Sequence, residues 1–175
     1  VCMQNPCSPL ELRYLELLGR SFPTIPQVTT EIINLKALLC LPKGTEHFIS
    51  DIHGEYGAFL HILKNASGVV REKIDILFEN SLTLRQRNAL ATLIYYPREK
   101  LERLHAAGTV TEEWYRITLL QLVSICRLVS AKYTRSKVRK ALPKDFAYVI
   151  EELITEKEEL LDKEAYYNSI INTII

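Results

Sequence analysis

The sequence predicts a mainly α-helical chain with one β-strand, and three observations lead to this prediction. Glycine supplies only 6 of the 175 residues, about half of the usual share of ~7%, so few turns that need a positive φ are expected. Apolar residues recur at intervals of three and four along most of the chain, which is the period of one helical face. The segment 46–52 is the exception, because it is short, carries Phe48, Ile49 and Ile52, and comes after a break at 42–44.

Proline and capping signals place two helices before this strand. Ser8 can cap a first helix that has Pro9 at its first position, and Pro23 restarts the chain toward a second helix over 27–39. The region after the strand has the period of consecutive helices, which we predict over 55–65, 83–95, 98–107, 112–132, 136–142, 145–154 and from 159 onwards.

The longest predicted helix, over 112–132, is expected to be central and buried. Thr109 and Glu112 have the spacing of a capping box ahead of it, and Gly108 is placed to end the preceding helix. Its apolar residues occupy most sides of the helix, so we also expect Cys126 to lie in the core.

Composition and charge exclude several classes of protein. Hydrophobic residues make up 47% and charged residues 25% of the chain, which is typical of a folded domain rather than of disorder. The 22 basic and 21 acidic residues nearly cancel, so no overall field favours nucleic acid or a membrane surface. No apolar run approaches the ~18 residues of a membrane span, and we expect no secretory leader.

The four cysteines, Cys2, Cys7, Cys40 and Cys126, have the spacing of neither a zinc knuckle nor a disulfide framework. We therefore expect reduced thiols and a cytoplasmic location. Cys2 and Cys7 together could chelate a metal ion, but a frayed N-terminal segment is the simpler explanation for them.

Two features suggest that this sequence is a segment of a longer protein. A single strand has no neighbour to pair with. The pattern Ile170, Ile171, Ile174 and Ile175 also leaves an apolar helical face without a cover. We expect these surfaces to meet the missing C-terminal part of the same chain or another copy in a homo-oligomer.

The segment with the clearest chemistry lies at the end of the predicted strand. Alternate strand residues point to one side, so Asp51 and His53 should converge there. One carboxylate oxygen and one imidazole nitrogen are half of the ligand set of a divalent cation such as Mn, Fe or Zn. Gly54 permits a sharp turn, and the next helix N-terminus favours anions such as phosphate. Metal-assisted hydrolysis fits this arrangement. A structural role is the alternative, with His53 capping the next helix and Asp51 held by loop amides.

The stretch Ser50-Asp51-Ile52-His53-Gly54 resembles the first motif, D-x-H-G, of the calcineurin-like metallophosphoesterases. The longer run 47–63, together with 119–142, resembles more narrowly the class III fructose-1,6-bisphosphatases of bacteria. This resemblance covers essentially the whole chain, as the N-terminal part of that enzyme.

The resemblance implies a two-metal phosphatase of carbohydrate metabolism, typically dependent on manganese, that hydrolyses fructose 1,6-bisphosphate in gluconeogenesis. It implies that Asp51 and His53 are ligands of the first metal ion. In the parent enzyme it implies an α/β metallophosphoesterase sandwich, begun by residues 1–64 and interrupted by a helical insertion over 65–175. The later motifs G-D-x-x-D-R-G and G-N-H-[DE] have no counterpart here. We therefore expect no catalytic residue in this segment, an inactive segment when it is isolated, and substrate-binding residues that are not yet identified.

A second candidate site is a run of six basic residues without an acidic one: Lys132, Arg135, Lys137, Arg139, Lys140 and Lys144. These side chains could hold the second phosphate of the substrate or an anionic effector. They could instead form a solvated face that the acidic stretch 151–164 balances. For the chain as a whole, the competing hypothesis is a helical interaction module without catalysis, in which Asp51 and His53 are incidental.

Overall fold

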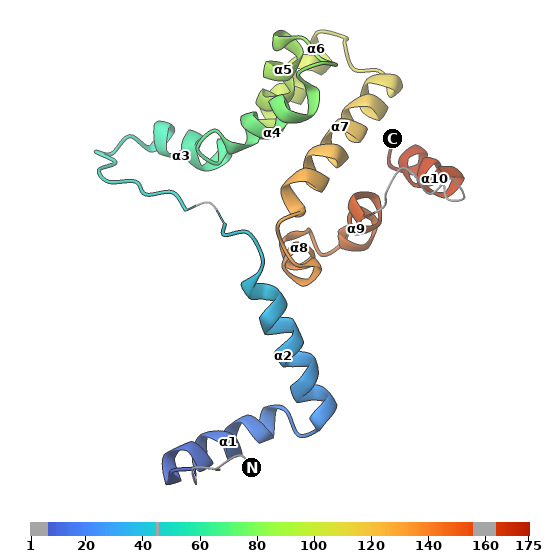
Figure 1. Cartoon of the computed structure of the whole chain (residues 1–175). Helices are drawn as coiled ribbons and strands as arrows, with labels where there is room; N and C mark the ends of the chain where they lie inside the picture. Colours follow the sequence, from blue (N-terminus) through green and yellow to red (C-terminus); the bar gives the residue numbers. More distant parts are fainter. Residues whose placement is uncertain (1–6, 45, 156–163) are drawn as a thin grey trace. The chain divides into compact units, whose positions relative to one another are not determined.

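The computed structural model describes residues 7–44, 46–155 and 164–175 (Figure 1). The chain forms two compact units, the N-terminal unit up to Lys43 and the C-terminal unit from Gly44 onwards. The N-terminal unit contains α1 (Pro9–Ser21) and α2 (Ile25–Leu39). The helices of the C-terminal unit are α3 (Tyr56–Asn65), α4 (Val69–Phe78), α5 (Leu84–Tyr95), α6 (Pro97–Ala106), α7 (Glu112–Ser130), α8 (Arg135–Ala141), α9 (Ala147–Thr155) and α10 (Glu164–Ile174).

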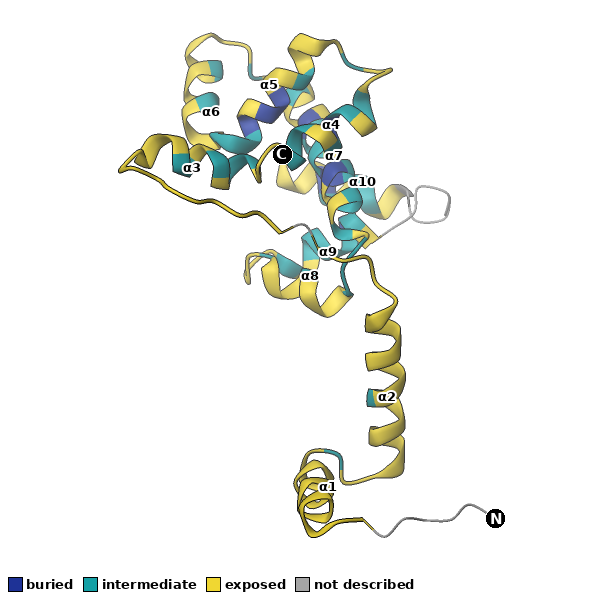
Figure 2. Ribbon diagram, turned by 60° about the vertical axis from the view of Figure 1, so that its left-hand side comes forward, coloured by how far each residue is buried: buried dark blue, intermediate teal, exposed yellow. Residues whose placement is uncertain are grey.

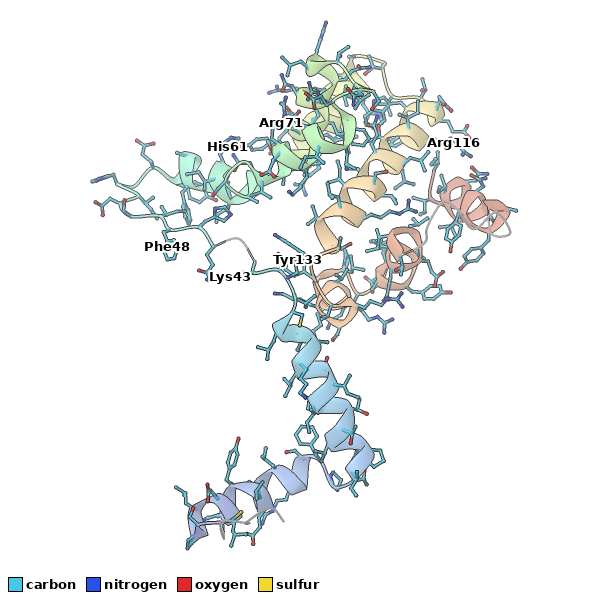
Figure 3. All side chains as sticks on the ribbon, viewed as in Figure 1. Lys43, Phe48, His61, Arg71, Arg116 and Tyr133 are labelled. Carbon is cyan, nitrogen blue, oxygen red and sulfur yellow. The ribbon has the colours of Figure 1, made fainter. Side chains whose placement is uncertain are left out.

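The prediction of a mainly α-helical chain is confirmed, whereas the predicted strand over 46–52 is not confirmed by this structure. Those residues are irregular and exposed, and the described part of the chain contains no strand. Phe48, labelled in Figure 3, is 92% exposed. The physical reason is pairing: an extended segment becomes a strand only when a neighbour completes its backbone hydrogen bonds.

The N-terminal unit has strong local signals and no core. Each of its helices begins with a capping box and a proline in the first turn, as Ser8 with Glu11 shows at α1 and Thr24 with Gln27 at α2. Neither α1 nor α2 buries a single residue, and Figure 2 shows both helices almost entirely in the colour of exposed residues. Their apolar side chains therefore contribute little burial energy within this unit.

A first core of the C-terminal unit joins α4, α5 and α7. Ile74 is completely buried there, and Leu90, Ala91 and Ile125 pack in the same cluster. The sequence pattern did not predict α4. Gly68, with a φ of 89°, precedes this helix, and no side chain caps it. Burial of Ile74 against two neighbouring helices is thus its main support.

A second core joins α7, α9 and α10 through Val123, Leu153 and Ile171. The central position of α7 is confirmed, since both cores use it, but the expected burial is only partial, because Ile117 and Leu120 are 46% and 44% exposed. Ile171, expected on an uncovered face, is only 4% exposed, whereas Ile174 remains 52% exposed. The expectation for Cys126 is wrong, because it lies on an exposed side of α7.

The ends of the helices around α7 agree partly with the predicted signals. Gly108 has a φ of 65° directly after α6, as expected of a glycine that ends a helix. The cap of α7 is Thr111, whose hydroxyl accepts a hydrogen bond from the Trp114 backbone N–H at 3.1 Å, and not the predicted Thr109. In the described part of the chain, no helix is both long enough and apolar enough to cross a membrane.

Candidate metal centre

The segment that carries Asp51 and His53 forms a tight turn. The Glu55 backbone N–H donates to the Ile52 carbonyl oxygen at 2.9 Å, which closes the turn. Its two central residues have positive φ values, 50° at His53 and 75° at Gly54, the pattern of a type I′ turn. Gly54 therefore provides the sharp turn that was predicted. His53 is more unusual, since few residues other than glycine adopt this conformation, although histidine does so more often than most.

The turn leads directly into α3. The Tyr56 N–H donates to the Gly54 carbonyl oxygen at 2.8 Å, and the Phe59 N–H donates to the Glu55 carbonyl oxygen at 3.0 Å. No side chain caps this helix end. The turn and the first turn of α3 therefore form one continuous hydrogen-bonded unit, in which the orientation of the helix sets the orientation of the turn.

Asp51 and His53 are both exposed, and neither side chain forms a hydrogen bond or an ion pair with a described residue. The expected convergence rested on strand geometry, and this geometry is absent because His53 lies inside the turn. The alternative structural role also lacks contacts here, since His53 does not cap α3 and Asp51 accepts no bond from a described amide. Both side chains are free to serve as ligands.

These two residues supply at most half of a coordination shell. Among the described residues, no group of three or more His, Cys, Asp or Glu side chains comes together. A carboxylate oxygen and an imidazole nitrogen suit Mn, Fe or Zn, so the donor set fits such an ion, but a hydrolytic centre needs further ligands.

The larger hollows of the C-terminal unit lie elsewhere. Two of them, with volumes of about 300 and 610 Å³, lie beside α5, α6 and α7 and share Leu93, Trp114 and Thr118, and the C-terminal end of α10 also lines the larger one. Their walls are mostly apolar, and no residue of the 50–56 turn lines them. They offer no ligand set for a metal ion, so the turn remains the candidate site.

The basic run 132–144 lies around the start of α8. Arg139 forms an ion pair with Glu151, whose Oε2 is 2.7 Å from the arginine Nε, and this hydrogen bond raises the pKa of Arg139. The ammonium groups of Lys132 and Lys137 lie over the ring of Tyr133, at 5.3 and 4.7 Å from its centre. The ion pair of Arg139 with Glu151 is the kind of contact expected if the basic run is a solvated face whose charge nearby acidic residues balance. Most of the other acidic residues of the stretch 151–164 fall in 156–163, which lie outside the described residues.

Comparison with known proteins places the chain in a family. The family model for "Firmicute fructose-1,6-bisphosphatase" matches residues 13–175. A relative from Clostridium tetani, named "Fructose-1,6-bisphosphatase class 3", is 58% identical over 165 residues. Relatives from Clostridium beijerinckii and from Clostridium botulinum (strain Loch Maree / Type A3) are 60% and 59% identical over 164 residues.

In each of these alignments, 94% of this chain is covered but only 25% of the relative. The chain thus spans about a quarter of the length of the curated relatives that it matches. No solved structure matches the chain. Since the family model covers nearly all of the sequence, the chain belongs to the Firmicute fructose-1,6-bisphosphatase family.

Proposed function

We propose that this chain is the N-terminal part of a fructose-1,6-bisphosphatase and that Asp51 and His53 are ligands of its first metal ion. The complete enzyme would hydrolyse fructose 1,6-bisphosphate to fructose 6-phosphate and phosphate. Membership of the family supports the reaction. One structural observation supports the site: an exposed turn presents a carboxylate and an imidazole that have no partner among the described residues.

The chain's own residues would hold the metal ion, which we expect to be Mn²⁺, on one side only. Asp51 offers a carboxylate oxygen and His53 an imidazole nitrogen, from nearby positions at the start of the turn that His53 and Gly54 form. When bound, a metal pair supplies Lewis-acid polarisation of the phosphate and an activated water. The backbone N–H groups at the start of α3, which no side chain caps, would favour a phosphate oxygen beside the metal.

The wider assignments depend on the same proposal. In the full-length protein, the segment 46–52 would pair as a strand of an α/β phosphoesterase sandwich, with residues 1–64 in that domain and 65–175 as a helical insertion. The three described cysteines, Cys7, Cys40 and Cys126, have free thiols, which supports a cytoplasmic location. Isolated residues 1–175 would lack turnover, because the ligands of the second metal ion and the general acid would come from the rest of the full-length protein.

The test uses the full-length enzyme with the variants Asp51→Asn and His53→Gln. We expect each to weaken Mn²⁺ binding, measured by electron paramagnetic resonance, and to lower phosphate release. The loss of a direct ligand should cost at least about 100-fold, the upper end of the 10–100-fold range typical of outer-shell partners. Asp145→Asn is the matched control, since Asp145 is also exposed and lies far along the sequence in the same unit.

Two results would contradict the proposal. Unchanged Mn²⁺ affinity in both variants would remove Asp51 and His53 from the metal site. Sustained turnover by the isolated 175 residues, lost on Asp51→Asn, would show that the metal centre does not need other parts of the protein. The competing hypothesis of a non-catalytic interaction module predicts no phosphate release from any form.

A further inference from the structure

A contact far from the turn holds α3 against the start of α6. The Nδ1 atom of His61 lies 2.7 Å from the hydroxyl of Tyr96, within hydrogen-bond distance. The two rings are also stacked, with an angle of 6° between their planes and 5.9 Å between their centres. Tyr95 meets the same imidazole edge-on, with ring centres 5.8 Å apart. Figure 3 labels His61 on α3.

This contact adds to the packing of α3 against α4 and α5. None of its residues is buried, so its packing against α4 and α5 uses only half-buried side chains. The ammonium group of Lys64, one turn after His61, lies 4.4 Å from the centre of the Tyr96 ring. Two side chains of α3, the exposed His61 and the half-buried Lys64, therefore converge on the single ring of Tyr96.

The direction of α3 is transmitted to the candidate metal ligands. The bonds from Glu55 to Ile52, from Tyr56 to Gly54 and from Phe59 to Glu55 join the turn to the helix without a break. A rotation of α3 would thus move the imidazole of His53 with it. Metal coordination tolerates errors of only about 0.2 Å in ligand distance, so a small change of helix direction would be felt at the site.

We propose that His61 and Tyr96 are positioning residues for the metal site: their contact fixes α3, and through it the turn that presents His53 and Asp51. This inference rests on the proposed metal-ligand role of these two residues. In this proposal His61 and Tyr96 act through α3 and are not themselves metal ligands. Their role resembles that of outer-shell partners in metal sites, whose removal costs 10–100-fold in metal affinity.

The chain contains a matched control for this contact. His105 and Tyr115 form the same pair of groups, with Nε2 3.1 Å from the hydroxyl, but they join α6 to the first turns of α7 and do not involve α3. Tyr96→Phe and Tyr115→Phe therefore remove the same hydroxyl from the same kind of pair, and both keep the aromatic ring.

The experiment measures Mn²⁺ affinity, melting temperature and amide hydrogen exchange of residues 52–59 in the full-length enzyme. We expect Tyr96→Phe to weaken Mn²⁺ binding about 10-fold and to speed exchange over 52–59, with an unchanged melting temperature. Tyr115→Phe should change neither Mn²⁺ affinity nor that exchange. In His61→Asn, Tyr96→Phe should have no additional effect, because the shared contact is already lost.

Wild-type affinity and exchange in Tyr96→Phe would overturn the proposal. Equal losses in Tyr96→Phe and Tyr115→Phe, or a loss explained by a lower melting temperature, would also overturn it, because the contact would then be merely structural. Failure of the proposed function has a different signature: Asp51→Asn itself would leave Mn²⁺ affinity unchanged. In that case the exchange of 52–59 still decides whether Tyr96 holds the turn.

Discussion

The two units of this chain contain the same kind of helix start but differ in how far they bury the helix behind it. Thr24 in the N-terminal unit and Thr83 in the C-terminal unit both form a capping box with the glutamine three residues later. Each threonine hydroxyl accepts a hydrogen bond from the backbone nitrogen of that glutamine, at 3.4 Å for Thr24 and 3.3 Å for Thr83. Behind the first cap, Ile33 of α2 is 63% exposed. Behind the second, Leu90 of α5 is 5% exposed.

This difference separates two contributions to a helix. Capping groups and a proline in the first turn specify where a helix begins, and they act within a few residues. Helices of the length of α1 and α2, 13 and 15 residues, are marginal in water when an apolar face is not buried. The C-terminal unit supplies that burial through α7, and the N-terminal unit supplies none within itself.

The largest effect should come from the buried side of this comparison. Ile74→Ala removes a completely buried side chain and should cost about 2–5 kcal/mol of unfolding free energy. Ile33→Ala in α2 should cost less than ~0.5 kcal/mol, as expected of an exposed position. Trp114, the only tryptophan in the sequence, lies in the C-terminal unit and reports its unfolding in denaturant. An equal loss of unfolding free energy in Ile74→Ala and Ile33→Ala would show that α2 is buried in the protein in solution.

A smaller difference should separate the two caps. Thr83→Ala should lower the unfolding free energy of the C-terminal unit by about 1 kcal/mol, because α5 belongs to the cooperative core. Thr24→Ala removes the same bond but should only speed hydrogen exchange at the start of α2. Its effect on the Trp114 unfolding transition should be absent. A shift of that transition by Thr24→Ala would mean that the two units unfold together.

The same division between local and distant causes decides which helices could be predicted from the sequence. Helix starts at Ser8 and Thr83 and the helix end at Gly108 were predictable, since each depends on a few neighbouring residues. The helix α4 (Val69–Phe78) was not. It has no capping side chain and is rich in β-branched residues, which favour strands locally. Its stability depends on burying Ile74 against residues more than twelve positions away.

The candidate site divides similarly. The motif around Asp51 and His53 and the turn at Gly54 were visible in the sequence. The left-handed conformation of His53 was not, since the strand pattern assigned it an extended backbone. No local pattern connects His61 with Tyr96, which are 35 residues apart and meet only because α3 packs beside α5.

Acid should act on the two units through different carboxylates. In the C-terminal unit, Asp75 accepts a hydrogen bond from Arg71 at 2.9 Å and pairs with Arg87. The hydrogen bond from Arg71 is the main cause that lowers the pKa of Asp75. Desolvation opposes it, and the two guanidinium charges and the Arg87 hydrogen bond add to the lowering. A carboxyl group with a lowered pKa stabilises the fold above its unfolded pKa, and this contribution is lost as the pH falls through the folded pKa.

We therefore expect the melting temperature of the C-terminal unit to fall below about pH 4, near the unfolded pKa of aspartate. Asp75→Asn should lower the melting temperature at pH 7 and flatten this acid dependence. In the N-terminal unit, the backbone N–H of Ser8 lowers the pKa of Glu11 in the same direction. Glu11→Gln should affect only the helicity of α1, measured by hydrogen exchange. If the melting temperature of Asp75→Asn falls at low pH as steeply as that of the wild type, other carboxylates cause the acid dependence.

The smallest expected effect on the unfolding free energy is that of Asp51→Asn. Asp51 contrasts with Asp75, which lies in the same unit. Asp75 bridges two arginines, whereas Asp51 is exposed and bonds to no described residue. Asp51→Asn should thus change the unfolding free energy in the absence of metal by less than ~0.5 kcal/mol.

Added Mn²⁺ should raise the melting temperature of the full-length wild type but not of this variant, because a ligand stabilises only the state that binds it. A loss of more than ~1 kcal/mol without metal would identify Asp51 as a structural acceptor of the turn. Its free carboxylate would then no longer support the metal site. A carboxylate that contributes nothing to folding is free to bind a ligand, which is the role that we propose for Asp51.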